Sequence, residues 1–172
     1  MTSSPHGTIE RTPEGGIVRF DRHLAFPIGE VWASITEPTR LADWWPPFAA
    51  DISVDLREGG SLVFAWPDMD FPTLELRIVR LEAPTLLEHT HTSPGSWMRW
   101  ELESVPTGTR LRATYFVPDV DMAIERGDVL GLHHSLDRLE PALDGRPQAW
   151  DNDAFNALRA IYAGLTEAQP RA

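Results

Sequence analysis

The chain has 172 residues, which is enough for one domain with a sizeable buried core. It contains no cysteine and no lysine, which excludes disulfides, thiolate nucleophiles, cysteine metal sites, Schiff-base lysines and a phosphate-loop lysine. Its net charge of -11, without a basic block, makes nucleic acid and anionic membrane surfaces poor partners.

The N-terminal residues differ in composition from the rest of the chain. Residues 1–15 are rich in Ser, Thr, Pro and Gly, and we expect them to form a flexible tail. They show no signal-peptide pattern, and no apolar run in the chain approaches the length of a membrane span. We therefore expect a cytoplasmic protein that does not enter a membrane, with a single domain over residues 16–168.

The first predicted elements are one strand and two short helices. "GIVRFDRHLAF" over 16–26 alternates apolar and polar residues, which predicts a strand that ends before Pro27. "PIGEVWASIT" over 27–36 has apolar residues at helical spacing. Pro38 then opens a second short helix, "PTRLADWW".

The middle of the chain is typical of antiparallel β-structure. Gly59 and Gly60 form a hairpin turn in "REGG", and "PTGT" is a second turn signal. Because the turns between consecutive segments are short, we expect a meander. The predicted strands are "DISVDL", "SLVFAW", "TLELRIVRL", "LLEHTH", "WMRWELESV" and "RLRATYFV".

After Pro118 the apolar period changes from strand to helix. One long helix is predicted, with Asp119 or Asp121 capping its start and Gly145 at its end. Pro141 is expected to kink this helix or to mark its last turn. Residues 146–168 are predicted to add a C-terminal amphipathic helix, which either covers its own domain or pairs with a second copy in a homodimer.

Several short motifs in this order resemble a known family. They are "RHLAFPIGEVWASITEPTRLADWWPP", "DLREGGSLVF", "RLEAPTLLEHTH", "GTRL" and "GLHHSLDRLEPALDG". Together they are similar to START-like (SRPBCC) domains, and within them to the homologues of the activator of the heat-shock-protein-90 ATPase. The resemblance implies an α+β helix-grip fold, in which a curved antiparallel sheet wraps around a long C-terminal helix. This family is functionally mixed, so the fold does not determine the activity.

In such a fold, the space between sheet and long helix is either packed solid or open as a pocket. Strand alternation places His89 and His91 on the inward face, where the family usually has large apolar residues. An aromatic surface with a few polar tips is typical of small-molecule sites. The predicted ligand-binding residues are Trp44, Trp45, Phe64, Trp66, His89, His91, Trp100, Tyr115, His133 and Leu136. The alternative is that they simply fill the core.

"LADWWPPF" brings two adjacent tryptophans to the end of the second helix. On a helix, Trp44 and Trp45 point about 100° apart, so both cannot be buried in one place. We expect one to pack inward and the other to face an opening that Pro46 and Pro47 stiffen. The alternative is a hydrophobic plug.

Three functions remain open at this point. The first is binding of a small hydrophobic molecule without catalysis. The second is a cyclase- or hydratase-like enzyme in which His89, His91 or His133 is the general base, with Asp137 at i+4 orienting His133. The third is a co-chaperone-like modulator of an ATPase partner. We expect no cofactor and no metal, because the histidine pairs lack a third ligand at suitable spacing.

Overall fold

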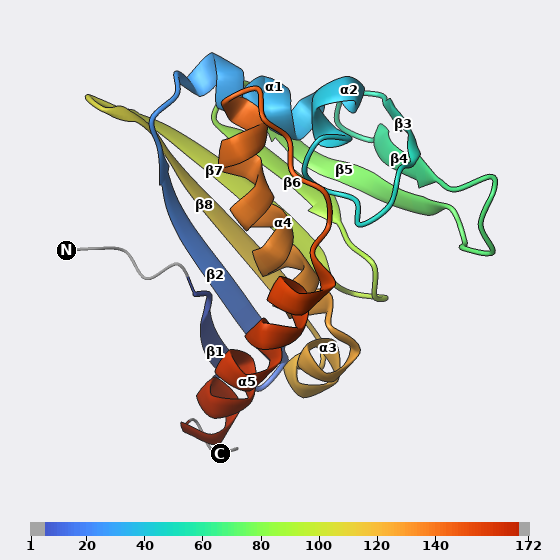
Figure 1. Ribbon diagram of the computed structural model, residues 1–172, viewed down its shortest axis with the longest axis vertical. Helices are drawn as coiled ribbons and strands as arrows, with labels where there is room; N and C mark the ends of the chain where they lie inside the picture. Colours follow the sequence, from blue (N-terminus) through green and yellow to red (C-terminus); the bar gives the residue numbers. More distant parts are fainter. Residues whose placement is uncertain (1–5, 169–172) are drawn as a thin grey trace.

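The computed structural model describes residues 6–168, in which eight strands and five helices follow one another (Figure 1). The strands are β1 (Thr8–Thr12), β2 (Gly15–Leu24), β3 (Asp51–Val54), β4 (Ser61–Ala65), β5 (Leu74–Glu82), β6 (Leu86–Thr90), β7 (Trp97–Val105) and β8 (Gly108–Val117). The helices are α1 (Ile28–Thr36), α2 (Pro38–Leu41), α3 (Val120–Arg126), α4 (Asp128–Leu143) and α5 (Asn152–Ala168).

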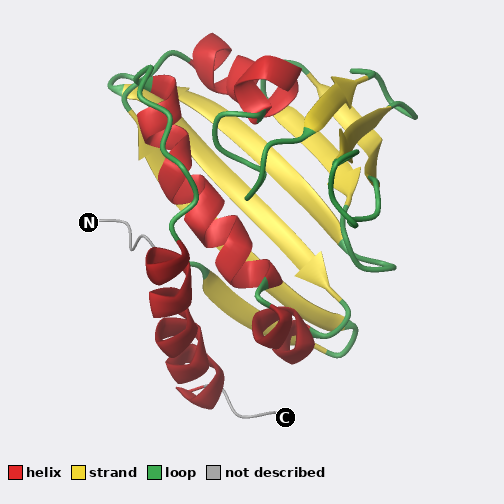
Figure 2. Cartoon of the chain, turned by 45° about the vertical axis from the view of Figure 1, so that its right-hand side comes forward, coloured by secondary structure: helices red, strands yellow, loops and turns green. Residues whose placement is uncertain are grey.

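All eight strands form one antiparallel sheet in the order β1-β2-β8-β7-β6-β5-β4-β3. From β3 to β8, consecutive strands pair with one another, so the predicted meander is confirmed. The last strand then returns to β2, which places the beginning and the end of the strand region side by side. α4 lies across one face of this sheet, and α1 and α2 lie near one of its ends (Figure 2). This is the α+β helix-grip arrangement that the sequence motifs predicted.

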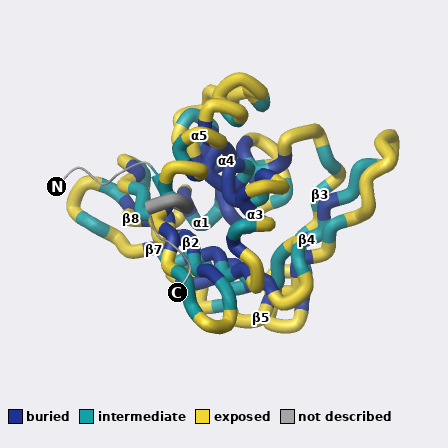
Figure 3. Tube along the Cα trace, turned by 90° about the horizontal axis from the view of Figure 1, so that it is seen from below, coloured by how far each residue is buried: buried dark blue, intermediate teal, exposed yellow. Residues whose placement is uncertain are grey.

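The core lies between α4 and the inner face of the sheet (Figure 3). Val18, Phe20 and Leu24 alternate inward from β2, and each is at most 3% exposed. Leu136 and Leu139 meet them from the helix. The same alternation sends Arg and Glu side chains to the outer face, where they form ion pairs such as Arg99–Glu88. The apolar period therefore fixes which face of each strand meets the helix.

The structure corrects three predictions about element boundaries. The second short helix, predicted over residues 38–45, ends at Leu41, and Trp44 and Trp45 lie in the turn that follows it. Residues 8–12, predicted as part of the tail, form β1 and pair with β2, which satisfies their backbone groups. Residues 1–5 lie outside the described range. The single long helix is two helices, α3 and α4, because Gly127 adopts a left-handed φ of 90° between them. Asp119, one of the two predicted caps, accepts a hydrogen bond from the Met122 N–H at the start of α3.

The C-terminal helix is present and packs on its own domain. Residues 146–151 are not helical, and α5 starts at Asn152, where the Asp151 carboxylate accepts from the N–H groups of Asp153 and Ala154. The Tyr162 side chain is fully buried beneath this helix. Pro141 lies in the last turn of α4, as one of its two predicted roles required.

No helix in the described part of the chain is long and apolar enough to cross a membrane. The cytoplasmic location and the homodimer stay predictions.

Candidate functional site

A cavity of about 250 Å³ opens between the sheet, the segment that follows α2, and the first half of α4. This volume is slightly below the range of about 300–1,000 Å³ typical of sites for drug-sized ligands. Its wall is mostly apolar and aromatic, with a few polar side chains. The lining residues are Trp45, Pro46, Pro47, Phe64, Trp66, Leu74, His91, Thr92, Gly127, Asp128, Gly131, Leu132, Ser135 and Trp150.

The two adjacent tryptophans, Trp44 and Trp45, have different surroundings. Trp44 is fully buried, and its indole N–H donates to the Ser34 carbonyl at 2.8 Å. Trp45 lines the cavity and packs against Phe64, with ring centroids 5.6 Å apart. Its carbonyl accepts a hydrogen bond from the Ser135 hydroxyl of α4 at 2.8 Å. One ring therefore anchors the segment in the core while the other forms a wall of the cavity.

Four of the ten predicted site residues line this cavity, namely Trp45, Phe64, Trp66 and His91. Four more are buried and do not line it: Trp44, His89, Trp100 and Tyr115. They support the wall from behind, since Trp100 packs edge-on against Trp45 with centroids 5.3 Å apart. Their role in the structure is therefore to position the wall.

His89 is a fully satisfied core residue. Its Nε2 accepts from the Trp100 indole N–H at 3.0 Å, so the ring proton is on Nδ1, which donates to the Thr90 carbonyl at 2.7 Å. Burial lowers the pKa of His89 to about 4, and the imidazole is neutral near pH 7. An indole and a backbone carbonyl therefore satisfy both ring nitrogens.

His91 differs from His89 because its polar atoms are not satisfied. Nδ1 is buried and has no hydrogen-bond partner among residues 6–168. Tyr115 packs edge-on against the imidazole, with centroids 5.0 Å apart, and Trp45 lies on another side. Burial, with a smaller effect of His89, lowers the pKa of His91 to about 3. A base this weak has little driving force to remove a proton near pH 7.

The structure places His133 and Leu136 away from the cavity. Residues of an α-helix are about 100° apart, so His133 lies on the opposite side of α4 from Gly131 and Ser135. Its Nδ1 is 2.8 Å from the Tyr162 hydroxyl of α5. Its Nε2 is 3.3 Å from the Asp137 carboxylate, the predicted i, i+4 partner. Leu136 is 3% exposed and belongs to the core.

The hydrogen bonds around His133 connect parts of the chain that are far apart in sequence. The Tyr162 hydroxyl accepts from the Gly7 N–H at 3.0 Å, and Arg22 of β2 donates to Asp137 at 2.9 Å. The Tyr162 hydroxyl can then donate to His133, whose other nitrogen donates to Asp137. The network thus holds α5 and the residues before β1 against α4.

Sequence reasoning missed the helical wall of the cavity. Asp128, Gly131 and Ser135 lie on one face of α4 at the spacing i, i+3 and i+7. Small and polar residues at these positions interrupt a helix whose other inward residues are leucines, and this interruption is the signal that could have been used. Trp150 was missed because it follows α4 in a segment that was predicted to begin a helix.

Gly131 leaves open space in the middle of a helix. A Cβ atom built on Gly131 would meet no other atom within 4 Å, apart from its chain neighbours and the helix's own backbone. Glycine in a helix interior costs about 0.5–1 kcal/mol relative to alanine, so packing does not explain this residue. An alanine would fit, and because Gly131 lines the cavity, a larger side chain is expected to take up part of its space.

The charged groups near the cavity do not form a metal site. Asp128 is paired with Arg126 at 2.7 Å. Within residues 6–168, no group of three or more His, Asp or Glu side chains could hold a metal ion. With a neutral His91, the polar part of the wall consists of hydrogen-bonding groups and one paired carboxylate.

Comparisons with solved structures give several matches to this fold. CalU16 from Micromonospora echinospora is 24% identical, with a TM-score of 0.69, over 92% of this chain and 94% of that chain. A conserved protein of unknown function, EF2215 from Enterococcus faecalis, is 19% identical, with a TM-score of 0.77, over 95% and 92%. NE0264 from Nitrosomonas europaea is 25% identical, with a TM-score of 0.64, but covers only 75% of this chain and 94% of its own.

No curated protein gives a significant match. A sequence model of one family, described as "Activator of Hsp90 ATPase homolog 1-like protein", matches residues 25–144. This range begins just after β2 and ends just after α4, and it contains the motifs on which the resemblance was based, apart from residues 22–24 and Gly145. The chain therefore belongs to the family of activator of Hsp90 ATPase homolog 1-like proteins, within the START-like (SRPBCC) superfamily.

Proposed function

We propose that the chain binds a small, largely hydrophobic molecule in the cavity between α4 and the sheet. The observation that carries this proposal is Gly131, where the helix presents empty space to a wall of aromatic rings. A domain that needed only a core would gain stability from a larger residue at this position. The glycine therefore indicates that the space is kept open.

The polar groups in the wall indicate how such a ligand is oriented. His91 is neutral and has an unsatisfied nitrogen, and Thr92 also lines the cavity. A buried polar group without a partner costs about 1–3 kcal/mol, and a ligand or a small shift of the ring would recover part of that cost. We therefore expect an uncharged ligand that carries at least one hydrogen-bonding group.

The proposal is tested by filling the cavity from the helix. The probe is N-phenyl-1-naphthylamine, an uncharged aromatic amine whose fluorescence rises in apolar sites. Gly131→Leu is expected to abolish its binding. The matched control is Gly164→Leu in α5, where an added side chain also meets nothing within 4 Å but lies on an exposed surface far from the cavity lining. Equal binding by both variants would contradict the proposal.

Catalysis receives less support from the site. His89 is fully hydrogen-bonded, His133 faces away from the cavity, and the low pKa of His91 makes it a weak base. These three residues were the candidate general bases. Binding without catalysis therefore explains the site better, because it requires no general base in the cavity.

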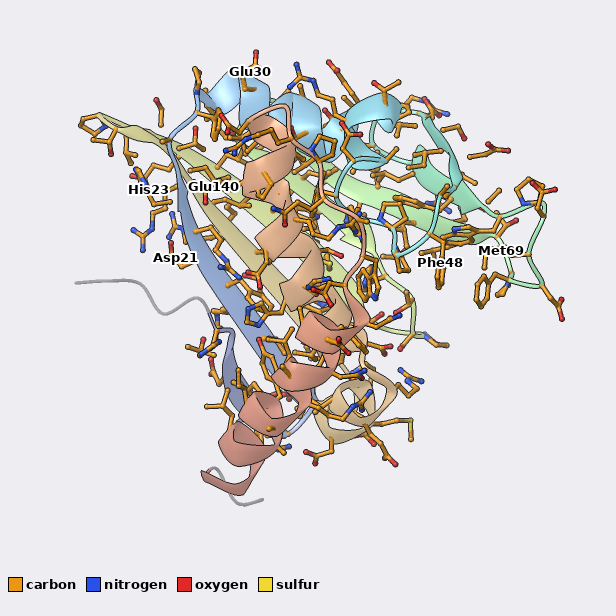
Figure 4. The ribbon with its side chains drawn as sticks, in the orientation of Figure 1. Asp21, His23, Glu30, Phe48, Met69 and Glu140 are labelled. Carbon is orange, nitrogen blue, oxygen red and sulfur yellow. The ribbon has the colours of Figure 1, made fainter. Side chains whose placement is uncertain are left out.

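A second candidate function is the binding of a protein partner, and an exposed apolar surface that adjoins the cavity at Trp66 favours it. Phe48 and Phe71 are each 48% exposed and stack with centroids 5.8 Å apart. Met69, which is 40% exposed, lies near Phe48 at the same end of the molecule (Figure 4). Exposed apolar clusters of this kind often mark interaction surfaces. If the partner is an ATPase, the protein should change its rate of ATP hydrolysis, and Phe71→Ser should remove that effect.

A further inference from the structure

The segment of residues 146–151, called the strap here, lies beyond the part of the chain that the family model matches. It leaves the end of α4 and runs back along that helix before α5 begins (Figures 1 and 2). Although its first residues are exposed, its tryptophan, Trp150, lines the cavity. The strap therefore contributes a wall that the matched domain alone does not contain.

Two side chains of α4 hold the strap in place. Arg138 donates from Nε to the Gln148 carbonyl at 2.9 Å, and its guanidinium lies 5.9 Å from the centre of the Trp150 ring. His134 accepts at Nε2 from the Asp151 N–H at 3.1 Å. The imidazole of His134 also packs edge-on against Trp150, with centroids 4.5 Å apart.

The same arginine also holds a second segment of the cavity wall. Its Nη1 donates to the carbonyls of Trp44 at 2.8 Å and Pro46 at 3.0 Å, which flank Trp45. Arg138 is only 7% exposed, and burial lowers its pKa. Because its planar group has several donors in fixed directions, one side chain can hold two segments of backbone at a set separation.

We propose that Trp150 determines which ligands the cavity accepts, and that Arg138 is the positioning residue that sets Trp150 against Trp45. This inference rests on the proposed ligand-binding function. Trp45 and Trp150 both line the cavity, and two rigid indoles in its wall limit the space available to a ligand, as packed rings do not compress. Removing one of these rings is expected to admit wider aromatic molecules, whereas the neutral polar groups of the wall stay in place.

The experiment uses a ladder of uncharged aromatic alcohols of increasing width: phenol, 1-naphthol and 9-phenanthrol. Each competes with N-phenyl-1-naphthylamine for the full-length protein. In Trp150→Ala, the ratio of 9-phenanthrol affinity to phenol affinity should rise at least tenfold. Trp150→Phe should restore much of the original preference. The control is Trp97→Ala, which removes a tryptophan that stacks on Phe116, outside the cavity lining.

The positioning role of Arg138 is tested with a variant that keeps its positive charge but changes its hydrogen-bonding geometry. Arg138→Lys keeps the charge but cannot reach all three carbonyls with a planar group. It should therefore change the same affinity ratio in the same direction as Trp150→Ala. Circular dichroism and thermal unfolding show whether the variant is folded at the assay temperature, and Trp150→Ala tests the inference if it is not.

The outcomes separate this inference from the proposed function. If Gly131→Leu blocks binding of the probe but Trp150→Ala keeps the wild-type ratio of 9-phenanthrol to phenol affinity, the cavity binds ligands and the role assigned to Trp150 is wrong. If neither the probe nor any alcohol binds the wild type, the proposed function fails and this inference fails with it. An equal rise of this affinity ratio in Trp97→Ala would also overturn the role assigned to Trp150.

Discussion

The two inward histidines predict a loss of stability on mild acidification. An unfolded chain binds a proton on each histidine near pH 6.5, but burial holds the pKa of His89 at about 4 and that of His91 at about 3 in the fold. The folded-state values are depressed, so this contribution to stability is fully present above pH 6.5. It is lost as the pH falls toward the folded-state values.

The magnitude follows from these values. At pH 5, the protonation of each histidine in the unfolded chain favours unfolding by about 2 kcal/mol, against about 0.2 kcal/mol at pH 7. His89 and His91 together should therefore remove about 4 kcal/mol between pH 7 and pH 5. Because small domains have about 5–15 kcal/mol in total, this loss is large enough to measure by urea unfolding.

The variant His91→Phe isolates one of these groups. Phenylalanine is of similar shape, does not titrate and needs no hydrogen bond, so the loss between pH 7 and pH 5 should shrink by about 2 kcal/mol. The control, His23→Phe, replaces an exposed histidine on β2 that bonds to Thr107, and it should keep the wild-type loss. If wild type and His91→Phe lose the same free energy, His91 is not held neutral by burial and the reasoning is wrong.

Three other substitutions test the supports of the fold by urea unfolding. Gly127→Ala forces a side chain into a left-handed φ and within 2.9 Å of Phe155, so it should lower the free energy of unfolding by about 1–3 kcal/mol. An unchanged urea midpoint would show that the junction of α3 and α4 does not require a glycine. Arg138→Met leaves three carbonyls without a donor and should cost about 3 kcal/mol or more, and a neutral result would show that water replaces the guanidinium. Tyr162→Phe removes the hydroxyl that bonds His133 and should cost about 1–3 kcal/mol of unfolding free energy. An effect confined to fraying of α5 in hydrogen exchange would contradict the role of the His133–Tyr162 network in holding α5 against α4.

The strands and their faces could be predicted because their signals are local. The alternation of Val18, Phe20 and Leu24 depends only on the period of a strand, and the turn at Gly59 requires a positive φ that glycine provides. β1 escaped prediction because its residues carry little apolar pattern and are ordered by pairing with β2. The break at Gly127 escaped because a glycine inside a helical pattern is compatible with both a continuous helix and a cap.

The site was predicted where strand alternation alone decides the direction of a side chain. Phe64, Trp66 and His91 follow from that rule. Trp45 diverges from Trp44 as expected, although both lie in the turn after α2 and not on the helix from which the angle was argued. His133 was misplaced because its direction depends on how α4 is rotated against the sheet, which its leucine stripe does not fix closely. Trp150 could not be found, since it reaches the cavity only through tertiary contacts of the strap with α4.

The central claim is that the cavity beside Gly131 holds a small molecule. The most direct measurement is native mass spectrometry of the wild-type protein purified without detergent, before and after denaturation, with Gly131→Leu and Gly164→Leu purified in parallel. The account predicts a small uncharged molecule that is released from wild type and Gly164→Leu and is absent from Gly131→Leu. The same released mass in all three proteins, or none in any together with no binding of the aromatic probe, would contradict it.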